Sequence, residues 1–374
     1  MKAAAERTLT LRELNRAMLA RQLLLERAKL DVVAAIERLP ALQAQWAPSP
    51  YYALWARLVD FTRERLWSAI EGHRVIRARL MRGTLHLVSA RDFYAFAVAT
   101  QDLQRGAWNR MQLAKGVEPS AIAKLAIAFA RRPRPRQEVI EHLRDRFGDV
   151  FNEQYRWLLW RFVSAHADLV SAPPGGHWDY GGTEAPYVAA KHWIAHGSRP
   201  SEDAALDLLV RRAVGAFGPM TVADVAKFAG QVPARIRPSL ERLTPRLERF
   251  RDEQGRALFD LKRAPRPSGE TASAVRLLPR YEQILIAYQY RDRVIAPGHR
   301  PAIYSKNGII EATFLVDGFV AGTWSVVRTK RDAVIALHPF ARLAPADRTA
   351  ALAEAERLAR FAVPDANVHG ARVA

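Results

Sequence analysis

One pattern recurs three times along the chain: a set of short amphipathic helices followed by a turn between two strand-like segments. In the first case, helical periodicity runs to His73, and VIRARLMRGTLHLV (residues 75–88) then predicts a strand, a glycine turn and a second strand. Helices followed by a β-hairpin outline a winged helix, a relative of the helix-turn-helix. The repeat therefore predicts tandem winged-helix units.

Turns rich in glycine and proline mark the limits of these units. We expect winged-helix units at residues 8–118, 119–190 and 200–262, with the stretch APPGGHWDYGG (172–182) as the tip of the second wing. Capping boxes support helix starts at Thr10 and Thr221. The three units share a pattern and not residue identity.

The composition changes after Leu261, where KRAPRPSGETAS (262–273) is rich in proline, serine and basic residues and indicates a linker. The rest is rich in strand-like segments, including ILIAYQY (284–290), and its VDG turn (316–318) is a hairpin signal. We expect residues 272–374 to form a small, β-rich, barrel-like domain with a final helix. The predicted fold class is therefore mainly α with β (α+β).

Charge is the strongest signal in the composition of this 374-residue chain. It has 57 Lys and Arg residues against 38 Asp and Glu residues, a formal net charge of +19. Such an excess favours a polyanionic partner, and above all nucleic acid. The alternative is the arginine bias of a GC-rich genome. No apolar run reaches the length of a membrane span, and the first ten residues contain no apolar core of a signal peptide.

Several common enzyme classes lack their signatures here. The chain has no cysteine, which excludes disulfides, thiolate catalysis and cysteine-bound metals. It has no glycine-rich phosphate loop, no dinucleotide fingerprint and no Gly-x-Ser-x-Gly elbow, and its histidines are scattered. We therefore expect neither a metal nor a cofactor.

Four stretches resemble the AlkZ-like DNA glycosylases, tandem winged-helix proteins that excise alkylated bases. They are LPALQAQ (39–45), LMRGTLHLVSARDF (80–93), LLPRYEQILIAYQYRDRVIAP (277–297) and FLVDGFVAGTW (314–324). Their order and spacing extend the resemblance over nearly the whole chain. The Gln-x-Gln after a helix, together with the Arg-Gly-Thr-Leu-His strand, is the most specific part.

The resemblance implies that Gln43 and Gln45 are the catalytic residues. An amide can donate and accept hydrogen bonds, so it can orient a water beside the sugar of an alkylpurine, whose cationic base is already a good leaving group. The alternative is a polar helix end whose side chains cap the backbone. Where family members often continue with Asp-Pro, this chain has Trp46, which we expect either in the core or beside the lesion as an apolar wedge.

Two basic regions are candidate DNA-binding surfaces. The first is the hairpin of unit one, with Arg77, Arg79, Arg82 and His86; the alternatives are a solvated wing and a hydrogen-bonded structural histidine. The second is the segment 288–308, where the resemblance implies a β-hairpin that enters the minor groove. Its candidate residues are Arg291, Arg293, His299, Arg300, Lys306 and Asn307. An ordinary charged loop is the alternative there.

The sequence thus predicts a monofunctional DNA glycosylase that hydrolyses the N-glycosidic bond of alkylated purines. Bulky adducts and interstrand crosslinks are possible substrates, in base excision repair or in self-resistance. We expect it to act as a monomer on double-stranded DNA with alkylated bases, in the cytoplasm at the nucleoid and away from membranes. The alternative is a non-enzymatic winged-helix DNA-binding protein, either a regulator or a lesion-binding resistance protein.

Overall fold

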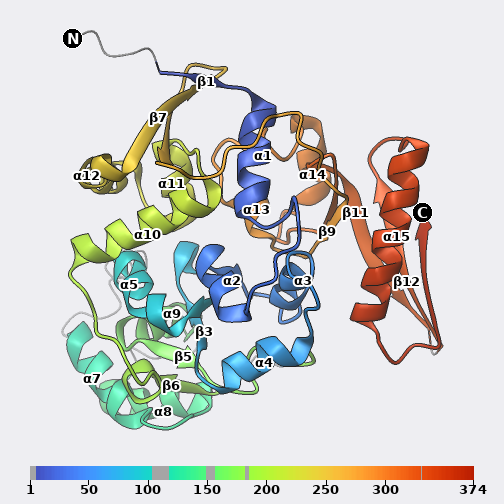
Figure 1. Cartoon of the computed structure of the whole chain (residues 1–374). Coiled ribbons are helices and arrows are strands. Elements are labelled where there is room, and N and C mark those ends of the chain that lie inside the picture. Colours follow the sequence, from blue (N-terminus) through green and yellow to red (C-terminus); the bar gives the residue numbers. More distant parts are fainter. Residues whose placement is uncertain (1–5, 103–117, 149–155, 182–184, 330) are drawn as a thin grey trace, which may run out of the picture.

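The computed structural model describes residues 6–102, 118–148, 156–181, 185–329 and 331–374, with helices and strands interspersed throughout (Figure 1). Within these residues the strands form three sheets, with the orders β1-β7-β8, β2-β4-β3-β5-β6 and β13-β12-β11-β10-β9. The expected mixture of helix and sheet is confirmed. No helix in the described ranges combines the length and apolar character that a membrane span requires.

The N-terminal segment alternates short helices and short strands. Its elements are α1 (Leu11–Arg21), α2 (Val32–Arg38), β2 (Leu42–Gln43), α3 (Ser49–Trp55), α4 (Arg63–Glu71), β3 (Val75–Arg79), the 3₁₀ turn η1 (Met81–Gly83), β4 (Leu85–Ser89) and α5 (Ala90–Thr100). The capping box at Thr10 is confirmed, because Glu13 accepts the Thr10 N–H at 2.9 Å and returns its own N–H to the Thr10 hydroxyl. The expected hairpin is confirmed as the antiparallel pair β3 and β4.

The second segment shares a sheet with the first. Its elements are α7 (Pro119–Phe129), α8 (Arg136–Phe147), α9 (Arg156–His166), β5 (Leu169–Ser171) and β6 (Tyr187–Ala189). β5 pairs with β3 at Arg77 and Ser171, so the two segments contribute to one five-stranded sheet. The helices have a core of their own, which includes Ile122, Val139 and Trp160. The turn between β5 and β6 carries the glycine-rich stretch that was expected at a wing tip.

The third segment follows the predicted order of helices and then a hairpin. Its elements are α10 (Glu202–Phe217), α11 (Val222–Ala229), α12 (Pro233–Arg242), β7 (Leu247–Asp252) and β8 (Ala257–Leu261). The capping box of Thr221 with Asp224 is confirmed. Pattern reading did not predict that β1 (Thr8–Leu9) pairs in parallel with β7, nor that a buried ion pair links α1 to β8. In that pair, Arg21 Nη1 lies 2.6 Å from Asp260 Oδ1.

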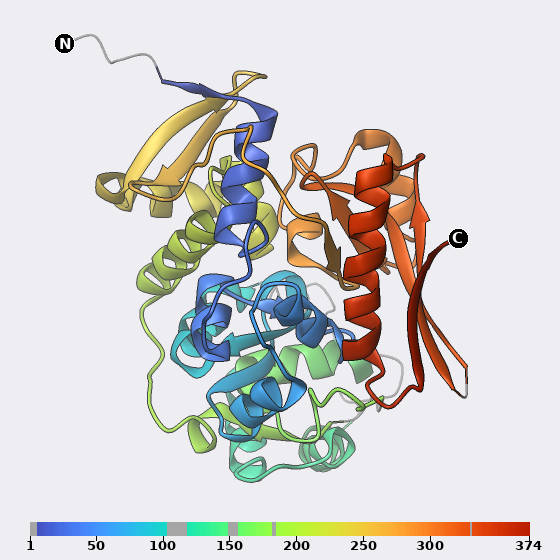
Figure 2. The same ribbon diagram turned by 45° about the vertical axis from the view of Figure 1, so that its right-hand side comes forward.

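The C-terminal segment is an open sheet covered by one long helix. Residues 262–275 have no regular structure, which confirms the linker. After it come β9 (Arg276–Leu278), α13 (Gln283–Ile286), the 3₁₀ turn η6 (Pro297–His299), α14 (Arg300–Ile303), β10 (Thr313–Val316), β11 (Phe319–Arg328), β12 (Asp332–Pro339), α15 (Pro345–Ala362) and β13 (Val368–Val373). Figure 2 shows α15 lying along one face of the sheet. The VDG hairpin is confirmed, with positive φ at both Asp317 and Gly318.

Three expectations for this segment are wrong. The sheet does not close as a barrel, because β9 and β13 are its two separate edges and β13 adds in parallel to β12. ILIAYQY begins as helix α13 and not as a strand, since the Glu282 side chain caps the Ile284 N–H at 3.2 Å. An apolar run buried on all sides is compatible with either element, so its pattern could not decide. The segment 288–308 contains η6 and α14 in place of the expected β-hairpin.

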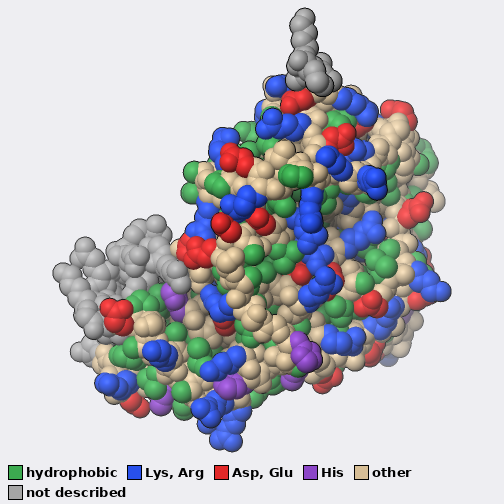
Figure 3. Space-filling model, turned by 60° about the vertical axis from the view of Figure 1, so that its left-hand side comes forward, with side chains coloured by type: hydrophobic (Ala, Val, Ile, Leu, Met, Phe, Trp, Pro, Cys, Tyr) green, Lys and Arg blue, Asp and Glu red, His purple; other side chains and the backbone are tan. Residues whose placement is uncertain are grey.

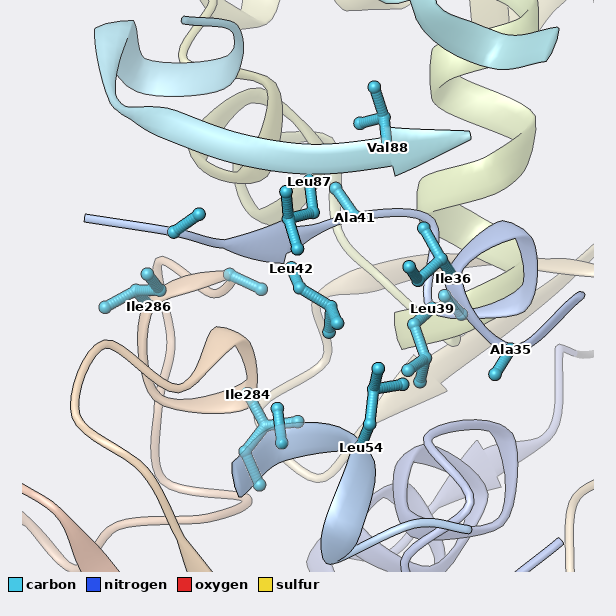
Figure 4. Packing of buried hydrophobic residues seen from close by; sticks show 14 of the residues in the cluster. Ala35, Ile36, Leu39, Ala41, Leu42, Leu54, Leu87, Val88, Ile284 and Ile286 are labelled. Carbon is cyan, nitrogen blue, oxygen red and sulfur yellow. The ribbon is translucent and has the colours of Figure 1, made fainter. Parts of the chain in front are cut away.

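A single large core joins the first, third and C-terminal segments. Around β2, Leu42 lies between Leu87 of β4 on one side and Leu54 and Ile284 on the other (Figure 4). Complete burial of one such aliphatic side chain stabilises the folded state by roughly 1.5–3 kcal/mol. The segment that carries the two candidate glutamines is therefore fixed from both sides.

Candidate active site

The Gln-x-Gln segment is a short edge strand and not a helix end. After α2 ends at Arg38, the chain extends along β4, where Leu42 pairs with Leu87 and Gln43 with His86. The pairing continues one residue further, because the Ala44 N–H donates to the Leu85 carbonyl at 2.7 Å. Gln43 is the last residue of β2, and Gln45 follows in a bend.

The two glutamines differ in exposure and in partners. Gln43 is buried at 7% exposure, and its Oε1 accepts a hydrogen bond from Arg82 Nη2 at 3.2 Å. Gln45 is exposed; its Oε1 accepts the Leu85 N–H at 3.4 Å, and its amide nitrogen donates to no described residue. No hydrogen bond connects either side chain to α2 among these residues, which disfavours the reading as a helix cap.

Gln45 opens onto a pocket of about 390 Å³ between the first and second segments. This volume lies within the roughly 300–1,000 Å³ that is typical of small-molecule sites. Gln45 and Trp46 form one side of the pocket, and the turn between β5 and β6 forms another. The lining residues are Gln45, Trp46, Ala47, Pro48, Arg77, Leu85, Trp178, Asp179, Tyr180 and Gly181.

Aromatic rings pack against one another at this pocket. Trp46 is half-buried and stacks on Tyr52 with 5.8 Å between ring centroids, while Tyr52 lies 4.8 Å from Trp178. The Arg63 guanidinium sits 3.6 Å above the Trp178 ring, a cation–π contact. Trp46 therefore combines the two expectations for it, since one part packs against the core and another part lines the pocket.

Arg82 connects the Gln-x-Gln segment to the rest of the molecule. Its Nη1 donates to the Phe228 carbonyl at 2.6 Å, and its Nη2 lies 3.2 Å from Gln43 Oε1, 3.1 Å from His86 Nε2 and 3.1 Å from Gln283 Oε1. Burial lowers the pKa of Arg82 to about 10, so the side chain stays charged at neutral pH. One half-buried cation thus orients the carbonyl of the Gln43 amide, and its partners come from three segments.

His86 is completely buried beside Arg82. Its Nδ1 donates to the Thr84 carbonyl at 3.0 Å, which leaves Nε2 to accept from Arg82. Burial, and then the charge of Arg82, lowers the pKa of His86 well below its usual range, so the ring is neutral. No surface of His86 remains for contact with DNA, and the hydrogen-bonded structural histidine is the reading that its geometry supports.

The neutral His86 makes stability dependent on pH. Because its folded pKa lies below its unfolded value of about 6.5, the unfolded chain binds the extra proton, and this stabilisation is lost as pH falls below about 6.5. We expect the free energy of unfolding to fall faster between pH 7.5 and 5.5 in the wild type than in His86→Gln. The limiting slope is about 1.4 kcal/mol per pH unit. Urea titrations at both pH values measure it, and equal slopes would contradict this assignment.

The other two arginines of the hairpin donate hydrogen bonds to backbone carbonyls. Arg77 donates to the Ala44 carbonyl, between the two glutamines, and to the Ser171 hydroxyl, each at 3.2 Å. Arg79 donates to the Gly83 carbonyl at 2.6 Å. Burial lowers the pKa of both, that of Arg79 to about 10. Their predicted contacts with phosphates stay predictions, whereas their contacts with the Gln45 strand and its hairpin are direct.

The second basic region is split between buried and exposed side chains. Arg293 is buried and donates to the Pro219 carbonyl at 2.7 Å, so it cannot contact DNA. Arg300 forms an ion pair with Asp292 at 2.5 Å, and His299 is half-buried against Phe340. All of these candidates except Arg293 keep surface available for DNA and stay predictions; they are Arg291, His299, Arg300, Lys306 and Asn307.

Lys227 on α11 is a basic residue that the sequence patterns did not single out. Burial lowers the pKa of Lys227, and the charges of Arg291 and Arg82 lower it further, so the three cations lie together. None of them forms an ion pair with an acidic side chain in the described part of the chain. No sequence signal could have shown this, because the three belong to three different segments.

The pocket also contains residues that the sequence reading placed only at a wing tip. Trp178, Asp179 and Tyr180 line the same pocket as Gln45. The one sequence signal that could have indicated these pocket residues was a run of aromatic and acidic side chains on a glycine-rich turn. Among the described residues no group of three or more His, Asp or Glu side chains is arranged to hold a metal ion.

Comparison with known proteins gives a consistent result. The family described as "DNA glycosylase AlkZ-like" matches residues 36–361. A Streptomyces sahachiroi protein described as "Interstrand DNA cross-link repair glycosylase" is 25% identical over 356 residues, which cover 86% of this chain and 88% of the relative. The solved structure of Streptomyces sahachiroi DNA glycosylase AlkZ superposes with a TM-score of 0.81 at 20% identity and covers 98% of this chain and all of that one.

Proposed function

Because the chain belongs to the AlkZ-like DNA glycosylase family, and is thus a DNA glycosylase, we propose that it hydrolyses the N-glycosidic bond of alkylated purines in duplex DNA. The resemblance read from the sequence is thereby confirmed. One observation carries the proposal: Gln45 is exposed in the pocket, whereas Gln43 is buried and anchored to Arg82. The NH2 group of the Gln45 amide is available to a ligand, and the neighbouring Gln43 amide is held by a cation.

The proposed chemistry suits a pair of neutral amides. Alkylation of a purine ring nitrogen makes the base cationic, so the C1′–N bond breaks without protonation of the leaving group, through an oxocarbenium-like transition state. The Gln45 amide then has only to orient a water beside C1′, a contribution of position. Neither amide can protonate a neutral base, which predicts weak activity on undamaged DNA.

DNA binding is proposed to use the winged-helix-like segments and their basic surface. The third segment has the helices α10 to α12 and a sheet at their end, the order of a winged helix. On the face drawn in Figure 3, Lys and Arg side chains spread over the surface and outnumber acidic ones. The cations Lys227 and Arg291 lie next to Arg82, which bonds Gln43, and we propose that they contact a phosphate near the lesion.

The open pocket supports bulky substrates as well as simple ones. Gln45 and Asp179 are both exposed, so an adduct can extend out of the pocket while the sugar lies at Gln45. We therefore propose that interstrand crosslinks through purine ring nitrogens are among the substrates, the lesion class in the description of the Streptomyces relative. A non-enzymatic DNA-binding protein, the alternative from the sequence, has no comparable support from the family.

Release of free base tests the proposed function. Purified protein is incubated with a duplex that contains one radiolabelled 7-methylguanine, with a duplex crosslinked between two guanine N7 atoms, and with undamaged DNA. We expect free 7-methylguanine with alkali-labile sites, conversion of the crosslink into single strands, and no release from undamaged DNA. Binding of all three duplexes without any release would overturn the proposal.

A further inference from the structure

The two amides leave one proton of the proposed reaction without an acceptor. When water attacks C1′, the base departs with the bonding electrons, and the water must lose a proton to become the new hydroxyl. A glutamine amide cannot take up that proton at neutral pH, since it is neither acid nor base there. A carboxylate in the same pocket could, and carboxylates have this role in other glycoside hydrolases.

Glu282 is the acid nearest in sequence to the C-terminal motif, but its carboxylate is committed to structure. It is buried at 3% exposure, lies 2.7 Å from Arg57 Nη2, and caps α13. A carboxylate that is both ion-paired and buried is not available to a substrate. Its position therefore excludes it as the missing proton acceptor.

Asp179 is the carboxylate that lines the pocket with Gln45. Its side chain is 75% exposed, and its Oδ2 lies 4.0 Å from Nδ1 of the His177 ring. His177 accepts the Asp179 N–H at 3.2 Å, which ties the backbone of this turn to its own side chain. Burial lowers the pKa of Arg63, which stacks on Trp178, and the charge of Asp179 acts in the opposite direction and raises it. No Lys or Arg forms an ion pair with the Asp179 carboxylate among the described residues, so it remains free to accept a proton.

The first segment holds the turn that carries Asp179. The Tyr51 hydroxyl donates to the Gly176 carbonyl at 2.8 Å, and Arg63 stacks on Trp178 at 3.6 Å. Trp178 also contacts the rings of Tyr51 and Tyr52. These contacts hold the turn at the pocket that Gln45 also lines without a contribution from the Asp179 side chain, so that side chain is not needed to build the turn.

We propose that Asp179 is a further catalytic residue, which accepts the proton of the attacking water. The step balances: the C1′–N bond breaks and its electrons neutralise the cationic base, the C1′–O bond forms, and the proton passes from the water to the Asp179 carboxylate and then to solvent. The negative charge also favours the oxocarbenium-like sugar. This inference rests on the proposed function, because it concerns the same pocket and the same reaction.

The test compares Asp179→Asn with the wild type in single-turnover release of 7-methylguanine. We expect the rate to fall roughly 30-fold. General acid–base groups typically contribute ~10²–10⁴-fold to a rate, and the effect should be smaller here because solvent can also accept the proton at this exposed site. The wild-type rate should fall at acid pH, where a catalytic carboxylate becomes protonated, and the variant should lack this limb. Asp179→Glu should recover part of the rate. The control is Glu270→Gln, which removes an acid of 87% exposure in the linker and should react like the wild type.

Other outcomes separate the inference from the proposed function. A wild-type rate and an unchanged pH profile in Asp179→Asn would overturn the inference while base release by the wild type still supports the proposed function. A variant that loses both thermal stability and DNA affinity would also overturn it, because the role would then be structural. If the wild type releases no base, the proposed function fails and the inference fails with it.

Discussion

Gln45→Ala is expected to release 7-methylguanine about 100- to 1,000-fold more slowly than the wild type, the usual effect of removing one preorganised hydrogen-bonding group from a reaction centre. The reason is geometric: Gln45 is exposed in the pocket, and no helix or core contact depends on its side chain. The thermal midpoint and the affinity for a 7-methylguanine duplex should therefore change little. Single-turnover assays with enzyme in excess measure the chemical step.

Gln43→Ala should differ from Gln45→Ala in a way that identifies the two roles. Gln43 is buried and accepts from Arg82, so its loss should lower stability as well as rate. Gln137→Ala, which removes a half-buried glutamine of α8 that does not line the pocket, is a matched control and should keep the wild-type rate. Full activity in both Gln43→Ala and Gln45→Ala would refute the assignment of this motif.

Arg82→Met is expected to cost about 3–5 kcal/mol of unfolding free energy. The substitution removes the donor for four buried acceptors: the Phe228 carbonyl, Gln43, His86 and Gln283. Each acceptor left without a partner costs about 1–3 kcal/mol. Base release should fall as well, even at temperatures where the variant is folded, because Gln43 loses its anchor.

Urea titration and single-turnover release of 7-methylguanine measure the two effects of Arg82→Met. Arg360→Met is the control for stability: it breaks an exposed i,i+4 pair with Glu356 on α15 and should change the free energy of unfolding by less than about 0.5 kcal/mol. If the two variants were equally stable, Arg82 would not be the connection between segments that its contacts indicate.

Much of the fold could be predicted from local patterns in the sequence. The capping boxes of Thr10 and Thr221, the hairpin after Arg74 and the turn at Gly318 each depend on residues within a few positions, so the sequence predicts them directly. The pairing of β1 with β7 and of β3 with β5 joins residues far apart in the chain, and no local pattern contains that information. The strand prediction for ILIAYQY (284–290) was wrong for a related reason. The helix α13 begins there at its N-cap Glu282, whose carboxylate accepts a hydrogen bond from Arg57, a residue far away in the sequence.

Only the Gln-x-Gln part of the candidate site could be predicted from the sequence. The resemblance pointed to Gln43 and Gln45, but their different exposure follows from Arg82, whose contacts lie in three segments. Asp179 lies more than a hundred residues further along the chain and reaches the pocket because β5 pairs with β3. Pocket residues that meet through a shared sheet cannot be read from spacing.

The five-stranded sheet that carries both the Gln-x-Gln strand and the β5–β6 turn has a consequence for the nucleic acid. β2 is bonded to β4 and packed against the core, so the Gln-x-Gln segment has no freedom to advance toward a base within a straight duplex. Distortion must then come from the duplex itself, and bending a site costs of order 1–6 kcal/mol depending on its sequence. Lesions at flexible pyrimidine–purine steps should consequently be processed before identical lesions in stiff A-tracts.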